Sequence, residues 1–494
     1  MLFNSWQFLL FFPVVVLMYY VIPSGFRKIW LVAASYYFYM CWDAKYAILI
    51  LLTTVITYLS GILLFGIDTH LYSKKKKLVY RRIIVIVSFA SNLGILFFFK
   101  YFEWLIDNLN LLFSKDVSLP FSIVLPVGIS FYTFQALSYT VDVYRGEITA
   151  EKNFIKYALF VSFFPQLVAG PIERSKNLLS QLDCNKGFDY DNAKNGLLLM
   201  LWGFFEKIVI ADKAAMFVDS VYNDYAEQFG SVIMLATIMF AIQIYCDFGG
   251  YSHIAIGAAK VLNVRLMDNF RQPYLAQSIH DFWNRWHISL SSWFRDYLYI
   301  PMGGNRRGRI RKYWNLIIPF LVSGLWHGAS WHFVFWGMIH GLYQILSDLL
   351  SPLSEIVREN ISIKRDCFSY ILFRRLVTFV LVDFAWLFFR ANSMSDAIIL
   401  IKKMIFEFHP SGIVAESIWS CGLDKTQMLT LVFAIVMLLI VDSIHEMRIS
   451  IIDFLNKQNL IFRWGVYYSA ILFIIVSLIQ TFGTGASTFI YFQF

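Results

Sequence analysis

The feature that most constrains this chain is a series of apolar runs, each roughly 17 to 22 residues long, separated by short polar segments. An apolar helix of about 20 residues is long enough to cross the hydrocarbon core of a bilayer. Only 15% of the 494 residues are charged, against about 25% in a typical soluble domain. This composition excludes a water-soluble globular enzyme and a disordered chain. The sequence therefore predicts an all-α, polytopic helical membrane protein.

We expect about 10 to 12 spanning helices in a single domain over residues 1–494. Two apolar segments, residues 154–164 and 314–326, are too short to cross a bilayer, and prolines and glycines lie in or beside them. Such segments indicate short re-entrant helices around a central cavity, since backbone polar groups at membrane depth need partners. The amphipathic stretches 395–408 and 449–459 are predicted to lie in the membrane interface.

The excess of positive charge predicts topology rather than nucleic-acid binding. The 42 Lys and Arg residues outnumber the 33 Asp and Glu residues by nine, and many of them cluster between apolar runs. Clusters at residues 27–28 and 74–82 are expected on the cytoplasmic side, which places the N-terminus outside. The first run, residues 3–22, has no cleavage site and is predicted to be a retained helix. The basic run 306–312 is either a topology determinant or a dock for an acidic or phosphate-bearing donor.

Polar residues within apolar surroundings are the candidates for function, because such residues are costly at membrane depth. Asp247 interrupts an apolar run beside two glycines. In residues 278–296, Ser278 is expected to cap one long helix, and Asp281 and Arg285 to pair at i, i+4. On that helix one stripe would contain Trp286, Leu290 and Trp293, and His287 would lie on the neighbouring face with Trp283 and Ser291.

His327 is the sharpest candidate for catalysis. It lies between Gly324 and Gly328 after an apolar run, and burial there would keep its imidazole neutral and usable as a base. The alternative is a core histidine bound to a backbone carbonyl, and the same alternative holds for His287. We expect three further histidines to be structural: His280, His332 and His340.

Other kinds of site are not indicated. His327 and His332 are five residues apart, a poor spacing for one helical face, so no metal site is predicted. The sequence contains neither a GxSxG nor a GxxxxGK[ST] motif. The five cysteines are scattered and odd in number, which suggests neither a disulfide framework nor a zinc site.

Several long segments resemble the membrane-bound O-acyltransferase (MBOAT) superfamily, and more narrowly its alginate and peptidoglycan O-acetylation branch. The resemblance runs from about residue 30 to the end of the chain. The segments that carry it are YCDFGGYSHIAIG (245–257), NFRQPYLAQSIHDFWNRWHISLSSWFRDYLYIPMGGNRRG (269–308), SGLWHGASWHFVFWGMIHG (323–341), LPVGISFYTFQALSYTVDVYRG (125–146), FVSFFPQLVAGPIER (160–174) and the terminal FIYFQF (489–494).

The resemblance implies roles for two residues. The invariant histidine of the family's WHG motif corresponds to His327, and the histidine of its RWHxSLS motif corresponds to His287. Both are therefore expected to be catalytic residues, with His327 as the base and His287 orienting it or hydrogen-bonding the oxyanion. The branch usually has YSDIAIG where this chain has YSHIAIG, so His253 stands in place of an aspartate and is left without a role.

The resemblance also implies a reaction and a setting. It implies an O-acetyltransferase in the bacterial cytoplasmic (inner) membrane, contacting membrane lipid, that moves an acetyl group outward for O-acetylation of a polysaccharide such as alginate. The donor would be a cytoplasmic acyl thioester, acetyl-CoA or a docked acyl carrier protein, with no cofactor bound permanently. A separate extracytoplasmic acetyltransferase would complete the transfer, because a long polymer cannot easily reach a buried histidine.

Three alternatives remain open at this point. D-alanyl transfer to teichoic acid is the alternative within the same enzyme class. A transporter would also have broken helices, but the sequence shows no inverted repeat and no acidic pair for ion coupling. A membrane scaffold of an export complex would not need His327.

Overall fold

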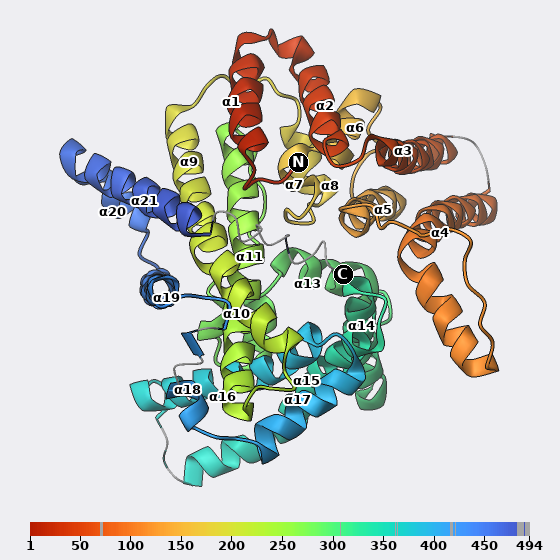
Figure 1. The fold of residues 1–494 in the computed structure, drawn as a ribbon. Helices are drawn as coiled ribbons and strands as arrows, with labels where there is room; N and C mark the ends of the chain where they lie inside the picture. Colours follow the sequence, from red (N-terminus) through yellow and green to blue (C-terminus); the bar gives the residue numbers. More distant parts are fainter. Residues whose placement is uncertain are drawn as a thin grey trace. The chain divides into compact units, whose positions relative to one another are not determined.

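The computed structural model describes residues 1–69, 73–306, 308–360, 362, 364–414, 418–419, 421–481 and 489. Every regular element in these residues is a helix (Figure 1), which confirms the all-α prediction. Arg307 of the basic run and residues 490–494 of the terminal motif lie outside the described residues. By internal contacts the chain forms two compact units. A single domain over residues 1–494 stays a prediction.

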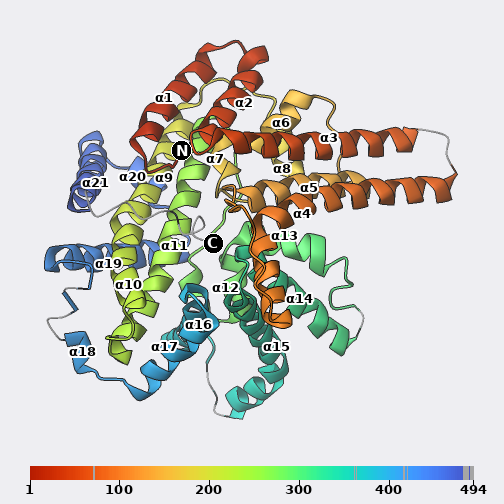
Figure 2. The ribbon, with the colours of Figure 1, turned by 45° about the vertical axis from the view of Figure 1, so that its right-hand side comes forward.

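Unit 1 comprises residues 1–200 and 252–267. Figure 2 shows its helices α3, α4 and α5 side by side. The basic residues at 74–82 form the first turns of α4, and Arg81 pairs there with Asp68 of α3. The α-helices of unit 1 are α1 (Trp6–Val21), α2 (Ser24–Met40), α3 (Ala47–Thr69), α4 (Lys74–Phe113), α5 (Ile129–Arg145), α6 (Phe154–Ser162), α7 (Phe164–Leu167), α8 (Ser175–Leu178), most of α9 (Tyr190–Phe204) and the end of α11 (Gly230–Val261).

Unit 2 comprises residues 201–251 and 268–494. The helix α11 (Gly230–Val261) begins in unit 2 and ends in unit 1. Two short π-helices, Phe205–Ala211 and Arg295–Tyr299, lie in unit 2. Its α-helices after α11 are α12 (Ile279–Arg285), α13 (Ile288–Phe294), α14 (Arg309–His327), α15 (Trp331–Asn360), α16 (Phe368–Arg390), α17 (Met394–Phe406), α18 (Ser411–Val414), α19 (Lys425–Glu446), α20 (Ile451–Asn456) and α21 (Leu460–Gln480), and α10 (Asp212–Asn223) precedes α11.

Six helices in the described residues are long and apolar enough to cross a membrane. The number of helices that are long and apolar enough is therefore smaller than the ten to twelve spans expected. Several apolar runs form helices that are shorter or carry more charged residues. In the last of these helices, Leu460–Gln480, only 11% of the apolar stretch is buried inside the protein. Most of its side chains therefore face outward, as expected for a helix in contact with lipid. The six are Ala44–Thr69, Lys74–Phe113, Gly230–Val261, Trp331–Ile356, Lys425–Glu446 and Leu460–Gln480.

The sequence predicts one long helix over residues 278–296, but the structure has two shorter helices there, α12 and α13. The Ser278 hydroxyl caps α12 by accepting from the Asp281 N–H, and Arg285 pairs with Asp281 at 2.8 Å, so both of these predictions are confirmed. Helix α12 then ends at Arg285, and α13 begins after His287. The predicted stripes of side chains along one continuous helix are therefore wrong, because the helical register is lost between the two helices.

Of the two short segments, only one is broken. Residues 154–164 form the short helix α6 and the first residue of α7, so the predicted short helix is present. Residues 314–326 instead belong to the continuous helix α14, which contains Pro319. Neighbouring helices can satisfy the backbone groups that such a proline frees. Helices α17 and α20 fall on the two amphipathic stretches, and their place in the interface stays a prediction, as does the central cavity.

Candidate active site

His327 is the last residue of α14 and is 4% exposed. The glycines near it allow the backbones of α14 and α15 to approach closely. A Cβ atom on Gly324 would lie 2.2 Å from the carbonyl oxygen of Phe333, and one on Gly337 would lie 2.1 Å from that of Phe320. Small residues at a helix contact are typical of membrane proteins, because they permit close packing. This packing fixes the end of α14, and with it the position of His327.

Aromatic side chains surround the His327 ring. Its centroid lies 5.0 Å from that of Trp326, 5.1 Å from that of Trp336 and 5.2 Å from that of Phe389, each nearly perpendicular to it. These rings come from α14, α15 and α16 and place the imidazole in apolar surroundings. An imidazole in such surroundings is favoured in its neutral form.

His287 occupies the break between α12 and α13. Its backbone is left-handed, with φ 43° and ψ 52°, a conformation that costs a non-glycine residue about 1–3 kcal/mol and often occurs at functional sites. The side chain is 1% exposed, and its ring meets that of Phe248 edge-on at 4.6 Å. Burial lowers the pKa of His287, which lies outside the six long apolar helices, so the ring is neutral near pH 7.

The hydrogen bonds of Asn269 determine the tautomer of His287. The Asn269 Oδ1 atom accepts from the Ser289 hydroxyl at 2.8 Å and from the Ser289 N–H at 3.4 Å. A backbone N–H can only donate, so this atom is the amide oxygen. The Nδ1 atom of His287 lies 3.0 Å from the same oxygen and must therefore carry the proton. In the neutral ring Nε2 is then the basic nitrogen.

The two predicted catalytic histidines lie close together in unit 2. Their ring centroids are 6.5 Å apart, and the Trp326 ring lies within 6.0 Å of His287 and 5.0 Å of His327. The two histidines are 40 positions apart in the sequence. They meet because His327 lies at the end of α14 and His287 lies in the break before α13. The geometry presents two buried imidazoles to a common region, an arrangement suited to proton transfer.

The other histidines have different surroundings. His280 is exposed on α12. His332 Nδ1 lies 3.0 Å from the Phe388 carbonyl and donates to it, and His340 Nδ1 accepts from Trp283 at 3.3 Å. These two contacts join neighbouring helices, as expected of structural residues. His253 lies on the part of α11 that belongs to unit 1.

Sequence reasoning missed the partners of two residues that it had singled out, Asp247 and His287. Asp247 forms an ion pair of 2.5 Å with Lys207, which lies in the π-helix Phe205–Ala211. The sequence shows Lys207 as a charge within an apolar run, and that signal could have identified it as the partner. Asn269 lies within a motif that the resemblance identified, but its role depends on a hydrogen bond across 18 residues.

Comparisons with known proteins identify the family of the chain. A sequence model of the membrane-bound O-acyltransferase (MBOAT) family matches residues 147–391, a range that contains both histidines. The "Probable alginate O-acetylase AlgI" of Azotobacter vinelandii is 36% identical over 403 residues, which cover 80% of this chain and 76% of the relative. The "Peptidoglycan O-acetyltransferase" of Helicobacter pylori is 31% identical over 541 aligned positions, covering 100% of this chain and 98% of the relative.

A more distant likeness extends to another activity. The "Teichoic acid D-alanyltransferase" of Streptococcus thermophilus is 27% identical over 235 residues, which cover 45% of this chain and 56% of the relative. The helices, the family match and the two relatives that cover most of the chain agree with one another. The chain belongs to the membrane-bound O-acyltransferase family and is a multi-pass membrane O-acyltransferase.

Proposed function

We propose that the chain moves an acetyl group from a cytoplasmic thioester across the bacterial cytoplasmic (inner) membrane for O-acetylation of a polysaccharide. The observation that carries this proposal is the pair of buried imidazoles, His287 and His327, with ring centroids 6.5 Å apart. The names of the two relatives that cover most of the chain support acetyl transfer to alginate or peptidoglycan. D-alanyl transfer has weaker support, since that relative is less similar and covers 45% of the chain.

In the proposed reaction His327 is the general base. The molecule that receives the acetyl group has a hydroxyl, which gives its proton to His327. At the same time the hydroxyl oxygen attacks the thioester carbonyl. The carbon–sulfur bond then breaks, and the departing thiolate takes the proton back from the imidazolium. A positioned base of this kind accelerates a reaction by about 10²–10⁴-fold. The apolar rings around His327 support this role, because they favour the neutral imidazole that a base requires.

The tautomer of His287 supports an orienting role rather than an oxyanion role. Its Nδ1–H faces the Asn269 oxygen, so neutral Nε2 can accept a hydrogen bond but not donate one. A hydrogen bond spans about 3 Å, so a hydroxyl placed between the two rings can contact both. His287 would then hold either that hydroxyl or an N–H of His327, and other donors would stabilise the oxyanion.

The reaction needs donors and partners from outside the chain. The donor is acetyl-CoA or an acyl carrier protein docked at the cytoplasmic face, and no metal or permanently bound cofactor takes part. The burial of His327 favours a relay, in which a separate extracytoplasmic acetyltransferase places the acetyl group on the polymer.

Co-expression tests this relay. We expect the protein, expressed alone in a host that makes the polymer but lacks such a transferase, to leave the polymer unacetylated. Adding the partner should restore the ester content, and His327→Ala should abolish it again. Acetylation of the polymer by the purified protein and donor alone would overturn the relay.

Vesicles separate the enzyme from a transporter. Purified protein in vesicles, given a radiolabelled acetyl thioester outside and a small alcohol inside, should form labelled ester inside. Accumulation of the intact labelled thioester within the vesicles would instead indicate transport.

A further inference from the structure

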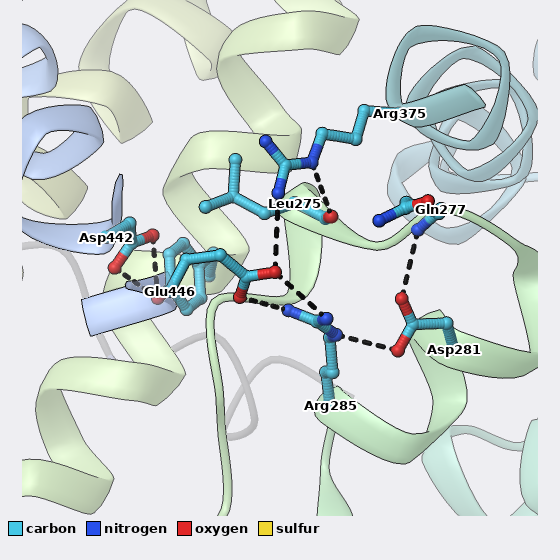
Figure 3. A network of polar contacts seen from close by, with 8 residues as sticks. Leu275, Gln277, Asp281, Arg285, Arg375, Asp442 and Glu446 are labelled. Atoms are coloured by element: carbon cyan, nitrogen blue, oxygen red, sulfur yellow. Dashed lines mark hydrogen bonds and ion pairs between the residues drawn. The ribbon is translucent and has the colours of Figure 1, made fainter. Parts of the chain in front are cut away.

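One acidic face of α19 contacts both α12, which ends two residues before His287, and α11, whose Phe248 packs against the His287 ring. Glu446, the last residue of α19, accepts two hydrogen bonds from Arg285, at 2.6 and 3.2 Å, and one from Arg375 at 3.3 Å (Figure 3). The Arg285 contact is bidentate, which fixes orientation as well as distance. Glu446 lies beyond residues 147–391, the range that the family model matches.

Asp442 lies one turn earlier on the same face of α19, at the i, i+4 spacing. Its carboxylate accepts from the Tyr245 hydroxyl of α11 at 3.1 and 3.3 Å. Three residues further along α11, the Phe248 ring contacts the ring of His287 at 4.6 Å. Asp442 therefore ties α19 to the helix that packs against the side chain of His287.

Glu446 binds the side chain of Arg285, two residues before His287 in the sequence. Arg285 is the last residue of α12, and its carbonyl oxygen accepts from the Arg271 N–H at 2.9 Å. After one further residue the chain reaches His287 in its left-handed conformation. A backbone conformation of this kind persists only where its surroundings hold it, and the Glu446–Arg285 contact lies directly beside it.

The neighbouring contacts complete the network in Figure 3. Arg285 also donates to Asp281 at 2.8 Å, Asp281 accepts from the Gln277 N–H at 3.0 Å, and Arg375 donates to the Leu275 carbonyl at 3.0 Å. Arg375 of α16 therefore binds the segment just before α12, and Glu446 of α19 binds the end of α12. The network is suited to fixing the place at which α12 ends.

We propose that Glu446 and Asp442 are positioning residues for His287, acting through Arg285 and Tyr245. This inference rests on the proposed function only in giving His287 a part in acyl transfer. The side chains of Arg285 and Glu446 are 20% and 24% exposed, and partly exposed ion pairs contribute little to stability. Loss of the Glu446 charge should therefore disturb the alignment of His287 more than the fold.

The test compares Glu446→Gln with a matched ion-pair variant. Asp348→Asn removes a partly exposed carboxylate on α15 that binds Lys312 and Tyr313 of α14 at 2.7 and 3.0 Å. Hydrogen–deuterium exchange over residues 285–291 should rise in Glu446→Gln and stay unchanged in Asp348→Asn. The kcat for acyl transfer should fall about 10-fold or more in Glu446→Gln alone, with KM for the thioester within about 2-fold.

Two further variants keep the test sharp. Glu446→Asp keeps the carboxylate and should restore much of the kcat. Tyr245→Phe removes only the hydroxyl, so it should fold and still lower kcat. Unchanged exchange over residues 285–291 in Glu446→Gln, or the same rise in Asp348→Asn, would overturn the inference.

The exchange and activity measurements also separate this inference from the proposed function. If His287→Ala were fully active, the catalytic proposal would fail, and exchange would still report whether Glu446 holds the segment. If exchange rose in Glu446→Gln while kcat stayed unchanged and His287→Ala was inactive, the positioning role would be wrong and the catalytic proposal would stand.

Discussion

His287 combines two properties that an acyl-transfer site can use. Its left-handed backbone turns the chain between α12 and α13, and its Nδ1–H faces the Asn269 oxygen. The ring lies 6.5 Å from that of His327, and the hydrogen bond leaves Nε2 as the basic nitrogen. A phenylalanine here would keep the ring packing and lose the basic nitrogen.

Asn269 offers a test of the tautomer through pH. Burial lowers the pKa of His287, and a carboxylate at Asn269 would raise it again by favouring the imidazolium. A protonated His287 cannot accept at Nε2, so Asn269→Asp should lose activity at a higher pH than the unmodified protein. The measurement is kcat against pH. Asn269→Ala should lower kcat without moving the acid limb, and superimposable acid limbs for Asn269→Asp and the unmodified protein would contradict the assignment.

At the scale of residues, the sequence identifies chemistry more readily than conformation. His327 could be singled out because it lies among glycines after an apolar run, and the WHG and RWHxSLS motifs indicated both histidines. The left-handed backbone of His287 could not be foreseen, because residues 278–296 have the pattern of one amphipathic helix. Its cause is tertiary: the Ile288 N–H bonds to the Asn269 carbonyl at 2.9 Å, a contact that propensity does not encode.

At the scale of helices, the α14–α15 pair depends on glycine. Gly337→Ala should destabilise the protein by about 1–3 kcal/mol, the usual cost of overpacking, because its Cβ would meet the Phe320 carbonyl at 2.1 Å. The control is Gly465→Ala on α21, where nothing lies within 4 Å of the added Cβ. Thermal unfolding in detergent should show a lower Tm for Gly337→Ala and an equal or higher Tm for Gly465→Ala. Equal Tm values for all three proteins would contradict the packing argument.

Helix ends were more predictable than helix continuity. Ser278 caps α12 through the Asp281 N–H, because a capping hydroxyl acts on its own neighbours. Pro319, by contrast, does not break α14. Whether a proline breaks a helix depends on what packs around it, and α15 lies against α14 in both ribbon views (Figures 1 and 2). Local signals therefore predicted caps well and breaks poorly.

At the scale of the whole molecule, the distribution of charge predicts the orientation in the membrane. The described residues contain six long apolar helices, and positive loops are retained on the cytoplasmic side. Arg306 is exposed just before α14. With the exposed Cys41 replaced by serine, Arg306→Cys should resist an impermeant thiol reagent in intact cells and react after permeabilisation. Rapid labelling in intact cells would reverse the orientation.

The central claim is that His327 is the base of the acyl transfer, and one measurement tests it most directly. The unmodified protein, His327→Ala and His280→Ala are purified and compared at matched amounts of folded protein. The assay measures transfer of radiolabelled acetyl from a thioester to a small alcohol. His280 is exposed on α12, so its removal controls for loss of an imidazole. We expect His280→Ala to keep its activity and His327→Ala to lose about 10²-fold or more with a similar Tm. Undiminished transfer by folded His327→Ala would contradict the account.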